Sequence, residues 1–292
     1  MNTVNKLVQE NLFIVLGGHK CGTTSLHQYL GQHPEIIMPQ FKGEDILKKP
    51  NLSLEQYYNQ YVNIGNKTFL GEVSSAYLYS KKACQNIKQY FPEAKLIAIL
   101  RNPFERAFSN FNDLAEDHPL KQRCSFEEIC KNPSDFLDEG VVNLGLYSSS
   151  IKIYLEHFNR EQICVLLFDD FVKNKSKFYS SLFEFVGVDP SFIPDTSVIL
   201  RKGGKTGIKN KAIKKILLDE NSWFRSMIGG MIKPFTTPDQ RRLIFLKTRN
   251  LFIKRESSSS LSTELKQNLI NFYREDVLRT QELLQVNLSH WL

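Results

Sequence analysis

Uninterrupted apolar runs recur along the chain, separated by stretches with helical spacing. Leu12–Leu16, Lys95–Leu100 and Ile163–Phe168 each place apolar residues next to one another, which is typical of strands covered on both faces. Thr68–Ser74 predicts a further strand. We therefore expect four strands that are buried within the protein.

Helical patterns accompany these strands. Leu26, Tyr29 and Leu30 lie on one helical stripe, and Pro103 is placed to open a helix directly after a strand. The segments 147–158 and 261–284 have the same spacing of apolar residues. Strands that alternate with helices are typical of a parallel sheet. The sequence therefore predicts an α/β protein with a central parallel β-sheet flanked by helices.

The chain has no internal repeat and no break in composition that marks a second domain. We therefore expect a single domain over residues 1–292, with an N-terminal extension over residues 1–11 and a C-terminal helix within residues 261–292. Residues 201–210 combine glycines with lysine and arginine. This composition predicts a mobile basic loop.

The overall composition is that of a globular protein, because 41% of the 292 residues are hydrophobic and 24% are charged. Lysine and arginine outnumber acidic residues by 38 to 31, a formal net charge of +7, which favours anionic partners such as nucleotide phosphates, nucleic acid or sulfated glycans. No apolar run approaches the roughly 18 residues of a membrane span, and the first residues lack a signal-peptide pattern. Five scattered cysteines argue against disulfides and zinc. We expect a reducing, cytoplasmic location.

The turn after the first strand has the glycine spacing of a phosphate-binding loop. Gly17 and Gly22 are separated by four residues, and small residues there let backbone N–H groups converge on phosphate oxygens at a helix N-terminus. A nucleoside-triphosphate loop needs lysine directly after the second glycine, where this chain has Thr23. The lysine here is Lys20, inside the loop, where it reaches a different part of a nucleotide.

The segment from Phe13 to Glu35, with this displaced lysine and the sequence Thr23-Thr24-Ser25, resembles the 5′-phosphosulfate loop of sulfotransferases that use 3′-phosphoadenosine 5′-phosphosulfate (PAPS). The second signature of that family is a strand that ends in arginine, followed by proline and a helix with serine eight residues after the arginine. Arg101 and Ser109 have this spacing here. Both residues follow the carboxyl end of a strand, so they can face one crevice, where arginine and serine donate to a phosphate.

The resemblance extends weakly over most of the chain. Two segments are similar to the middle region of the family: Gly145-Leu-Tyr147, and residues 165–170, which are expected as a strand. Residues 271–291 are similar to the family's C-terminal helix. The basic loop falls where carbohydrate-type members close over the donor. The donor-binding residues that the resemblance implies are Lys20, Cys21, Gly22, Thr23, Thr24, Ser25, Arg101, Ser109, Tyr147, Arg201, Lys202, Gly203, Gly204 and Lys205.

Sulfuryl transfer requires a cation at the leaving oxygen and a base beside the acceptor. Lys20 is the expected cation, and no metal is expected. The chain lacks the histidine segment of members that act on phenols and steroids. Glycan-type and bacterial members use a glutamate, and the matching position here is Glu44, with Gly43 as an insertion and Asp45 as its neighbour. Glu72 is the alternative candidate for the base. The other interpretation of Glu72 is that its carboxylate has a structural role.

The sequence thus predicts a PAPS-dependent sulfotransferase that acts on a hydroxyl or an amine of a saccharide and releases adenosine 3′,5′-bisphosphate (PAP). The acceptor is a glycan or a small molecule, and no nucleic-acid partner is expected. Two alternatives stay open: a P-loop kinase of a small molecule, and a non-enzymatic basic module that binds glycan or nucleic acid. The sequence does not indicate an oligomeric state.

Overall fold

The computed structural model describes residues 10–40, 42, 45–62, 64–196 and 261–292. The chain divides into two units, one formed by Met1–Asp195 with Leu261–Leu292 and the other by Thr196–Ser260. All described helices and strands belong to the first unit. The expectation of a single domain stays a prediction, and the predicted basic loop at residues 201–210 lies outside the described residues.

A single parallel sheet of five strands forms the centre of the first unit, in the order β2-β3-β1-β4-β5. This confirms the predicted α/β fold with a parallel sheet flanked by helices. The strands are β1 (Leu12–Gly17), β2 (Ile36–Ile37), β3 (Phe69–Val73), β4 (Lys95–Leu100) and β5 (Ile163–Leu167). The connection from β3 to β4 passes over β1, so the strand order reverses beside β1. Open α/β sheets bind ligands in the crevice at such a point, here the carboxyl ends of β1 and β4.

The described helices connect and cover these strands. They are α2 (Thr23–Leu30), α3 (Leu54–Asn59), α4 (Lys81–Tyr90), α5 (Pro103–Asp113), α6 (Pro119–Arg123), α7 (Phe126–Lys131), α8 (Tyr147–Leu155), α9 (Phe168–Lys173), α10 (Lys175–Val186) and α14 (Thr263–Leu284). Short 3₁₀ turns add η1 (Ile46–Lys48), η2 (Tyr77–Tyr79), η3 (Pro133–Glu139), η4 (Asn143–Gly145), η5 (Arg160–Gln162) and η8 (Ser289–Trp291). None of the helices in the described ranges is long and apolar enough to cross a membrane.

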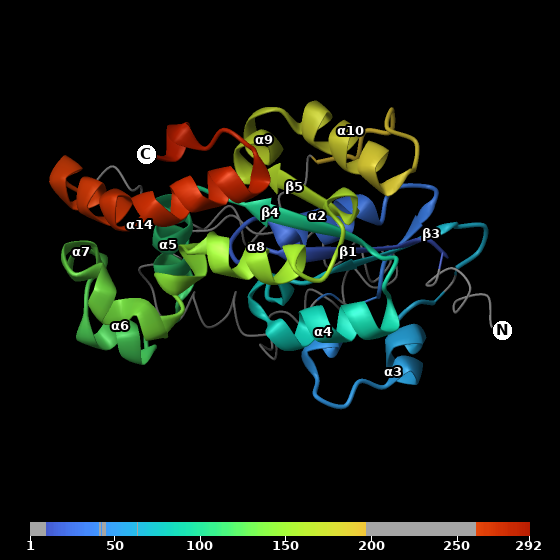
Figure 1. Ribbon diagram of the computed structural model, residues 1–292, viewed down its shortest axis with the longest axis horizontal. Coiled ribbons are helices and arrows are strands. Elements are labelled where there is room, and N and C mark those ends of the chain that lie inside the picture. The colour runs from blue at the N-terminus through green and yellow to red at the C-terminus, as the bar shows by residue number, and fades with distance from the viewer. Residues whose placement is uncertain (1–9, 41, 43–44, 63, 197–260) are drawn as a thin grey trace, which may run out of the picture. The chain divides into compact units, whose positions relative to one another are not determined.

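Both faces of the sheet are covered, because alternate residues of each strand enter different cores. Ile14 of β1 packs with α4, α5, α8 and α14, whereas its neighbours Phe13 and Val15 pack with α2 and α10. Figure 1 shows α10 and α4 on opposite sides of the strands. Burial on both faces explains why the central strands have continuous apolar runs rather than alternating ones.

All four predicted strands are present, and the largest difference in their bounds is at the end of β5. The segment 165–170, expected as a strand, is a strand only as far as Leu167, and Phe168 begins α9. Asp169 and Asp170 lie in the first turn of that helix, where carboxylates interact favourably with the helix dipole. The helix expected over 147–158 ends at Leu155.

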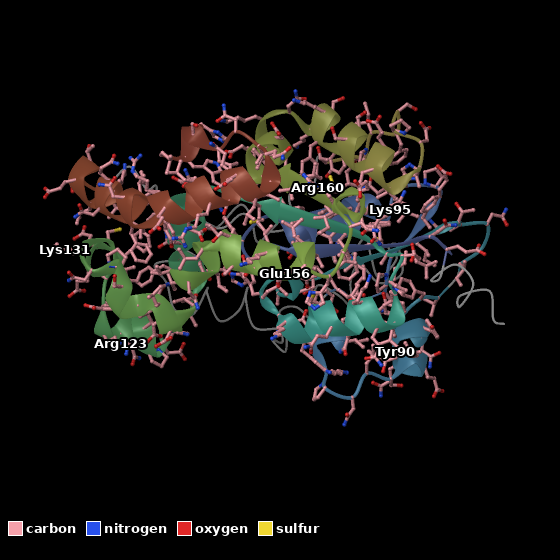
Figure 2. The ribbon with its side chains drawn as sticks, viewed as in Figure 1. Tyr90, Lys95, Arg123, Lys131, Glu156 and Arg160 are labelled. Atoms are coloured by element: carbon pink, nitrogen blue, oxygen red, sulfur yellow. The ribbon has the colours of Figure 1, made fainter. Side chains whose placement is uncertain are left out.

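The C-terminal helix α14 is attached to α8 by a partly buried polar contact. The Asp276 carboxylate accepts hydrogen bonds from the backbone N–H groups of Tyr147 (2.7 Å) and Ser148 (3.3 Å), which are the first residues of α8. Arg160, labelled in Figure 2, donates to the carbonyls of Ile163 and Leu284 and so joins β5 to the end of α14. Helix α14 therefore caps the start of α8, near the carboxyl ends of the strands that carry the expected site.

Candidate active site

The loop between β1 and α2 has a backbone that requires glycine at its ends. Gly17 and Gly22 have φ angles of +106° and +78°, which side chains rarely adopt. A Cβ atom at Gly22 would lie 2.9 Å from the Phe168 ring. Lys20 also has a left-handed backbone, with φ of +67°. The loop is therefore a specific conformation rather than a generic turn.

Two hydrogen bonds from its backbone fix this loop against the rest of the fold. The Gly18 N–H donates to Ile99 of β4 (3.1 Å), and the His19 N–H donates to the Tyr79 hydroxyl (3.3 Å). Helix α2 starts at Thr23 without a side-chain cap on its first N–H groups. These groups carry partial positive charge at the helix N-terminus, so the loop and helix together suit an anion.

Lys20 lies at this loop with its side chain largely enclosed. Only 12% of the side chain is exposed, and its Nζ is 2.8 Å from Oδ2 of Asp113, the last residue of α5. The predicted leaving-group cation is thus in the phosphate loop, paired with a carboxylate that the sequence did not indicate.

Arg101, directly after β4, contacts the same loop. Its Nη1 donates to the backbone carbonyl of Lys20 (3.2 Å), and its guanidinium lies over the Phe168 ring, 4.9 Å from the centroid. Its Nη2 is 3.6 Å from Oε2 of Glu105. The structure therefore brings the two predicted cations, Lys20 and Arg101, together at the crevice between β1 and β4.

Tyr147 is fully buried, and its hydroxyl donates to the backbone carbonyl of Arg101 (2.8 Å). Because Asp276 caps the helix that begins at Tyr147, this contact links α14 to the arginine. Tyr147 therefore supports the site through the backbone of Arg101.

Helix α5 turns one face toward both cations. Glu105, Ser109 and Asp113 are spaced by four residues, so they lie on one stripe of the helix. The first contacts Arg101 and the last contacts Lys20, which places the half-buried Ser109 between them on the same stripe. Glu105 and Asp113 each lie four residues from Ser109 in the sequence, a spacing that indicates a shared helix face but not the cations that this face contacts.

The remaining loop residues differ in what they offer. Thr23 and Ser25 are buried and Thr24 is half-buried at the start of α2. Burial raises the pKa of the Cys21 thiol to about 11, so this side chain is a neutral part of the core beneath the loop. Burial, followed by the charges of Arg106 and Lys20, lowers the pKa of His19 to about 4, so its imidazole is neutral at neutral pH.

Glu72 of β3 lies in the core rather than at an open surface. The Tyr77 hydroxyl donates to its Oε1, whereas its buried Oε2 has no hydrogen-bond partner among the described residues. Burial raises the pKa of Glu72 to about 7. These contacts suit the structural role that the sequence allowed for this carboxylate.

The buried carboxyl of Glu72 predicts a specific dependence of stability on pH. Between its ordinary pKa of 4.5 and about 7 the folded protein binds more protons than the unfolded chain, so the free energy of unfolding falls as pH rises through this range. Glu72→Gln keeps an acceptor for Tyr77 and removes the titration. We expect the variant to gain up to about 3 kcal/mol relative to wild type between about pH 4 and pH 8.

Urea unfolding of both proteins across this range measures the difference. His19, whose pKa is lowered, contributes a slope of opposite sign, but it is common to both proteins and cancels. Parallel stability curves would show that Glu72 titrates normally in the folded state.

Several predicted site residues lie outside the described residues. These are Glu44 and the basic residues and glycines of the loop, Arg201, Lys202, Gly203, Gly204 and Lys205. Their roles stay predictions. Among the residues that the structure describes, no group of three or more His, Cys, Asp or Glu side chains could hold a metal ion.

Known proteins are similar to this chain in sequence and in fold. A family model described as "Sulfotransferase domain" matches residues 10–244. The mouse bifunctional heparan sulfate N-deacetylase/N-sulfotransferase 4 is 28% identical over 200 residues, which is 62% of this chain and 22% of that protein. The chain spans about a fifth of the length of the curated relatives it matches.

Two solved structures have the same fold. A sulfotransferase from Alicyclobacillus acidocaldarius matches with a TM-score of 0.66 and 24% identity, covering 96% of this chain and 98% of its own. A mouse sulfotransferase solved with PAP matches with a TM-score of 0.51 and 15% identity, covering 95% of this chain and 86% of its own.

Proposed function

The chain belongs to the sulfotransferase domain family and is a transferase, and from this premise we propose that it moves a sulfuryl group from PAPS to a saccharide amine or hydroxyl. The observation that carries the proposal is the meeting of Lys20 and Arg101 at the crevice between β1 and β4. PAPS has anionic groups at both ends of its ribose, and these two cations with the α2 N-terminus suit both.

The site residues that the structure describes bind different parts of the donor in this proposal. The loop amides and the start of α2 bind the 5′-phosphosulfate, and Lys20 stabilises the charge that develops on the leaving phosphate oxygen. Arg101 and Ser109 bind the 3′-phosphate. Tyr147 fixes the backbone of Arg101, and Phe168 stacks on its guanidinium.

The acceptor class is supported by the curated relatives, whose names describe heparan sulfate N-sulfotransferases. The positive charge of the chain suits an anionic saccharide. A kinase is disfavoured, because Thr23 stands where a triphosphate loop has lysine.

Binding of PAP without metal tests the donor assignment. We expect PAP to raise the melting temperature in the presence of a chelator, because a ligand that binds only the folded state stabilises it. Stabilisation by ATP with Mg²⁺ but not by PAP would contradict the proposal.

Transfer from ³⁵S-labelled PAPS to heparan bearing free glucosamine amines, to a neutral oligosaccharide and to 4-nitrophenol tests the acceptor. We expect label in a saccharide. Label in 4-nitrophenol alone would keep the donor and overturn the acceptor class.

A further inference from the structure

We propose that Asp113 is the group that takes the proton from the acceptor during sulfuryl transfer. This inference rests on the proposed function and adds to it the identity of the base. The observation behind it is that Asp113 is in direct contact with Lys20, the cation placed at the leaving oxygen.

The two side chains of this ion pair differ in their exposure to solvent. The Lys20 side chain is 12% exposed, whereas the Asp113 side chain is 42% exposed, and their charged atoms are 2.8 Å apart. The ammonium is therefore enclosed at the phosphate loop, and the carboxylate is partly exposed to solvent. An acceptor reaches the donor from solvent, so it meets the carboxylate beside the reacting group.

Helix stability does not account for a carboxylate at this position. Asp113 is the last residue of α5, where the negative end of the helix dipole disfavours an acidic side chain. Its place on the stripe with Glu105 and Ser109 instead directs it toward the loop. The position is thus explained by the contact with Lys20.

Other carboxylates near the expected base are occupied differently. Glu72 is buried and accepts a hydrogen bond from Tyr77. Asp45 accepts a hydrogen bond from the Ser74 hydroxyl (2.6 Å) and is 3.6 Å from the Lys48 ammonium. Of these three described carboxylates, Asp113 is the one in an ion pair with Lys20.

The chemical step is balanced with these residues alone. The acceptor nitrogen or oxygen forms a bond to sulfur while the bond from sulfur to the 5′-phosphate oxygen breaks. The electron pair of that bond goes to the phosphate oxygen, beside Lys20, and the acceptor's proton goes to the Asp113 carboxylate. When the donor binds, its phosphosulfate shares the ammonium with Asp113. Weaker attraction to a cation makes a carboxylate a better proton acceptor.

Asp113→Asn tests this assignment, because the amide keeps the size of the side chain and cannot accept the proton. We expect turnover of labelled PAPS with free-amine heparan to fall by about 10²–10⁴-fold. PAP affinity, measured by calorimetry, should stay within about threefold or become tighter, because an anion that competes for Lys20 is removed. Glu116→Gln is the matched control, since Glu116 is exposed, three residues away, and pairs with Lys121.

A second variant distinguishes proton transfer from a structural effect. Asp113→Ala should regain part of its turnover when formate is added, because an exposed site lets a small carboxylate replace the missing one, and Asp113→Asn should regain none. Turnover of Asp113→Asn within about threefold of wild type would overturn the inference. A tenfold or larger loss of PAP affinity, matched by the loss of turnover, would overturn it too, since the residue would then only position Lys20.

Glu44→Gln is measured beside these variants. If it alone abolishes turnover, Glu44 is the base and Asp113 is not. Failure of the proposed function looks different, because wild type itself would then neither bind PAP nor transfer label to any acceptor.

Discussion

Lys20→Ala is expected to lower turnover by about 10²–10³-fold, the usual effect of removing one group that stabilises developing negative charge. Lys20 is enclosed in a loop whose backbone is fixed at Gly18 and His19, so its ammonium is held in place before the donor binds. PAP affinity should fall as well, because the ammonium contacts the 5′-phosphate before and after transfer.

The control for this variant is Lys152→Ala. Lys152 forms an ion pair with Glu156 on the exposed surface of α8. The Lys152→Ala substitution should therefore leave turnover and PAP affinity unchanged. Steady-state kinetics and calorimetry on both variants make the comparison. If Lys20→Ala lowers PAP affinity but keeps turnover at saturating donor, the lysine binds the donor and does not act on the leaving group.

Arg101→Ala is expected to weaken PAP binding by about ten- to a hundredfold, since a hydrogen bond to a charged group contributes about 1.5–3 kcal/mol. The Arg101 side chain is 19% exposed and its guanidinium stacks on Phe168, so the guanidinium is already oriented before a nucleotide arrives. Ser109→Ala should have a smaller effect of the same sign, because a hydroxyl contributes a single donor.

Adenosine 5′-monophosphate, which lacks the 3′-phosphate, shows which phosphate Arg101 binds. Wild type should prefer PAP strongly, and Arg101→Ala should show little preference. Equal preference in both proteins would assign Arg101 to another part of the donor. Arg101→Lys is a useful third protein, because it keeps the charge and loses the planar fork that reaches the Lys20 carbonyl.

The central fold could be predicted because its signals are local. A strand buried on both faces must be continuously apolar, and Lys95–Leu100 accordingly has the same bounds in the sequence analysis and in the structure. Strand β2 had no such signal, since it consists of Ile36 and Ile37 and depends on pairing with β3. Helix α4 was missed although Ser80 caps it and Ala83, Cys84 and Ile87 form its buried side.

The site residues could be predicted from the sequence where they follow the carboxyl end of a predicted strand. Lys20 lies in the loop that follows β1, and Arg101 directly follows β4, so the parallel pairing of these strands brings the two residues together. Asp113 could not be assigned from its spacing alone, because the end of α5 and the direction of Lys20 depend on tertiary packing. The support that Asp276 gives to α8 was equally invisible, since it joins residues 129 positions apart.

This distant contact has a consequence for how the protein is made. Ribosomes synthesise a chain from its N-terminus, so the phosphate loop and the five strands of the described sheet have been synthesised before Asp276 is added. Until then the first amides of α8, including that of Tyr147, lack the carboxylate that accepts their hydrogen bonds in the folded protein. We therefore expect the sheet to form early in synthesis, and the support that α14 gives to Tyr147 and Arg101 to be added after residue 276 has been made.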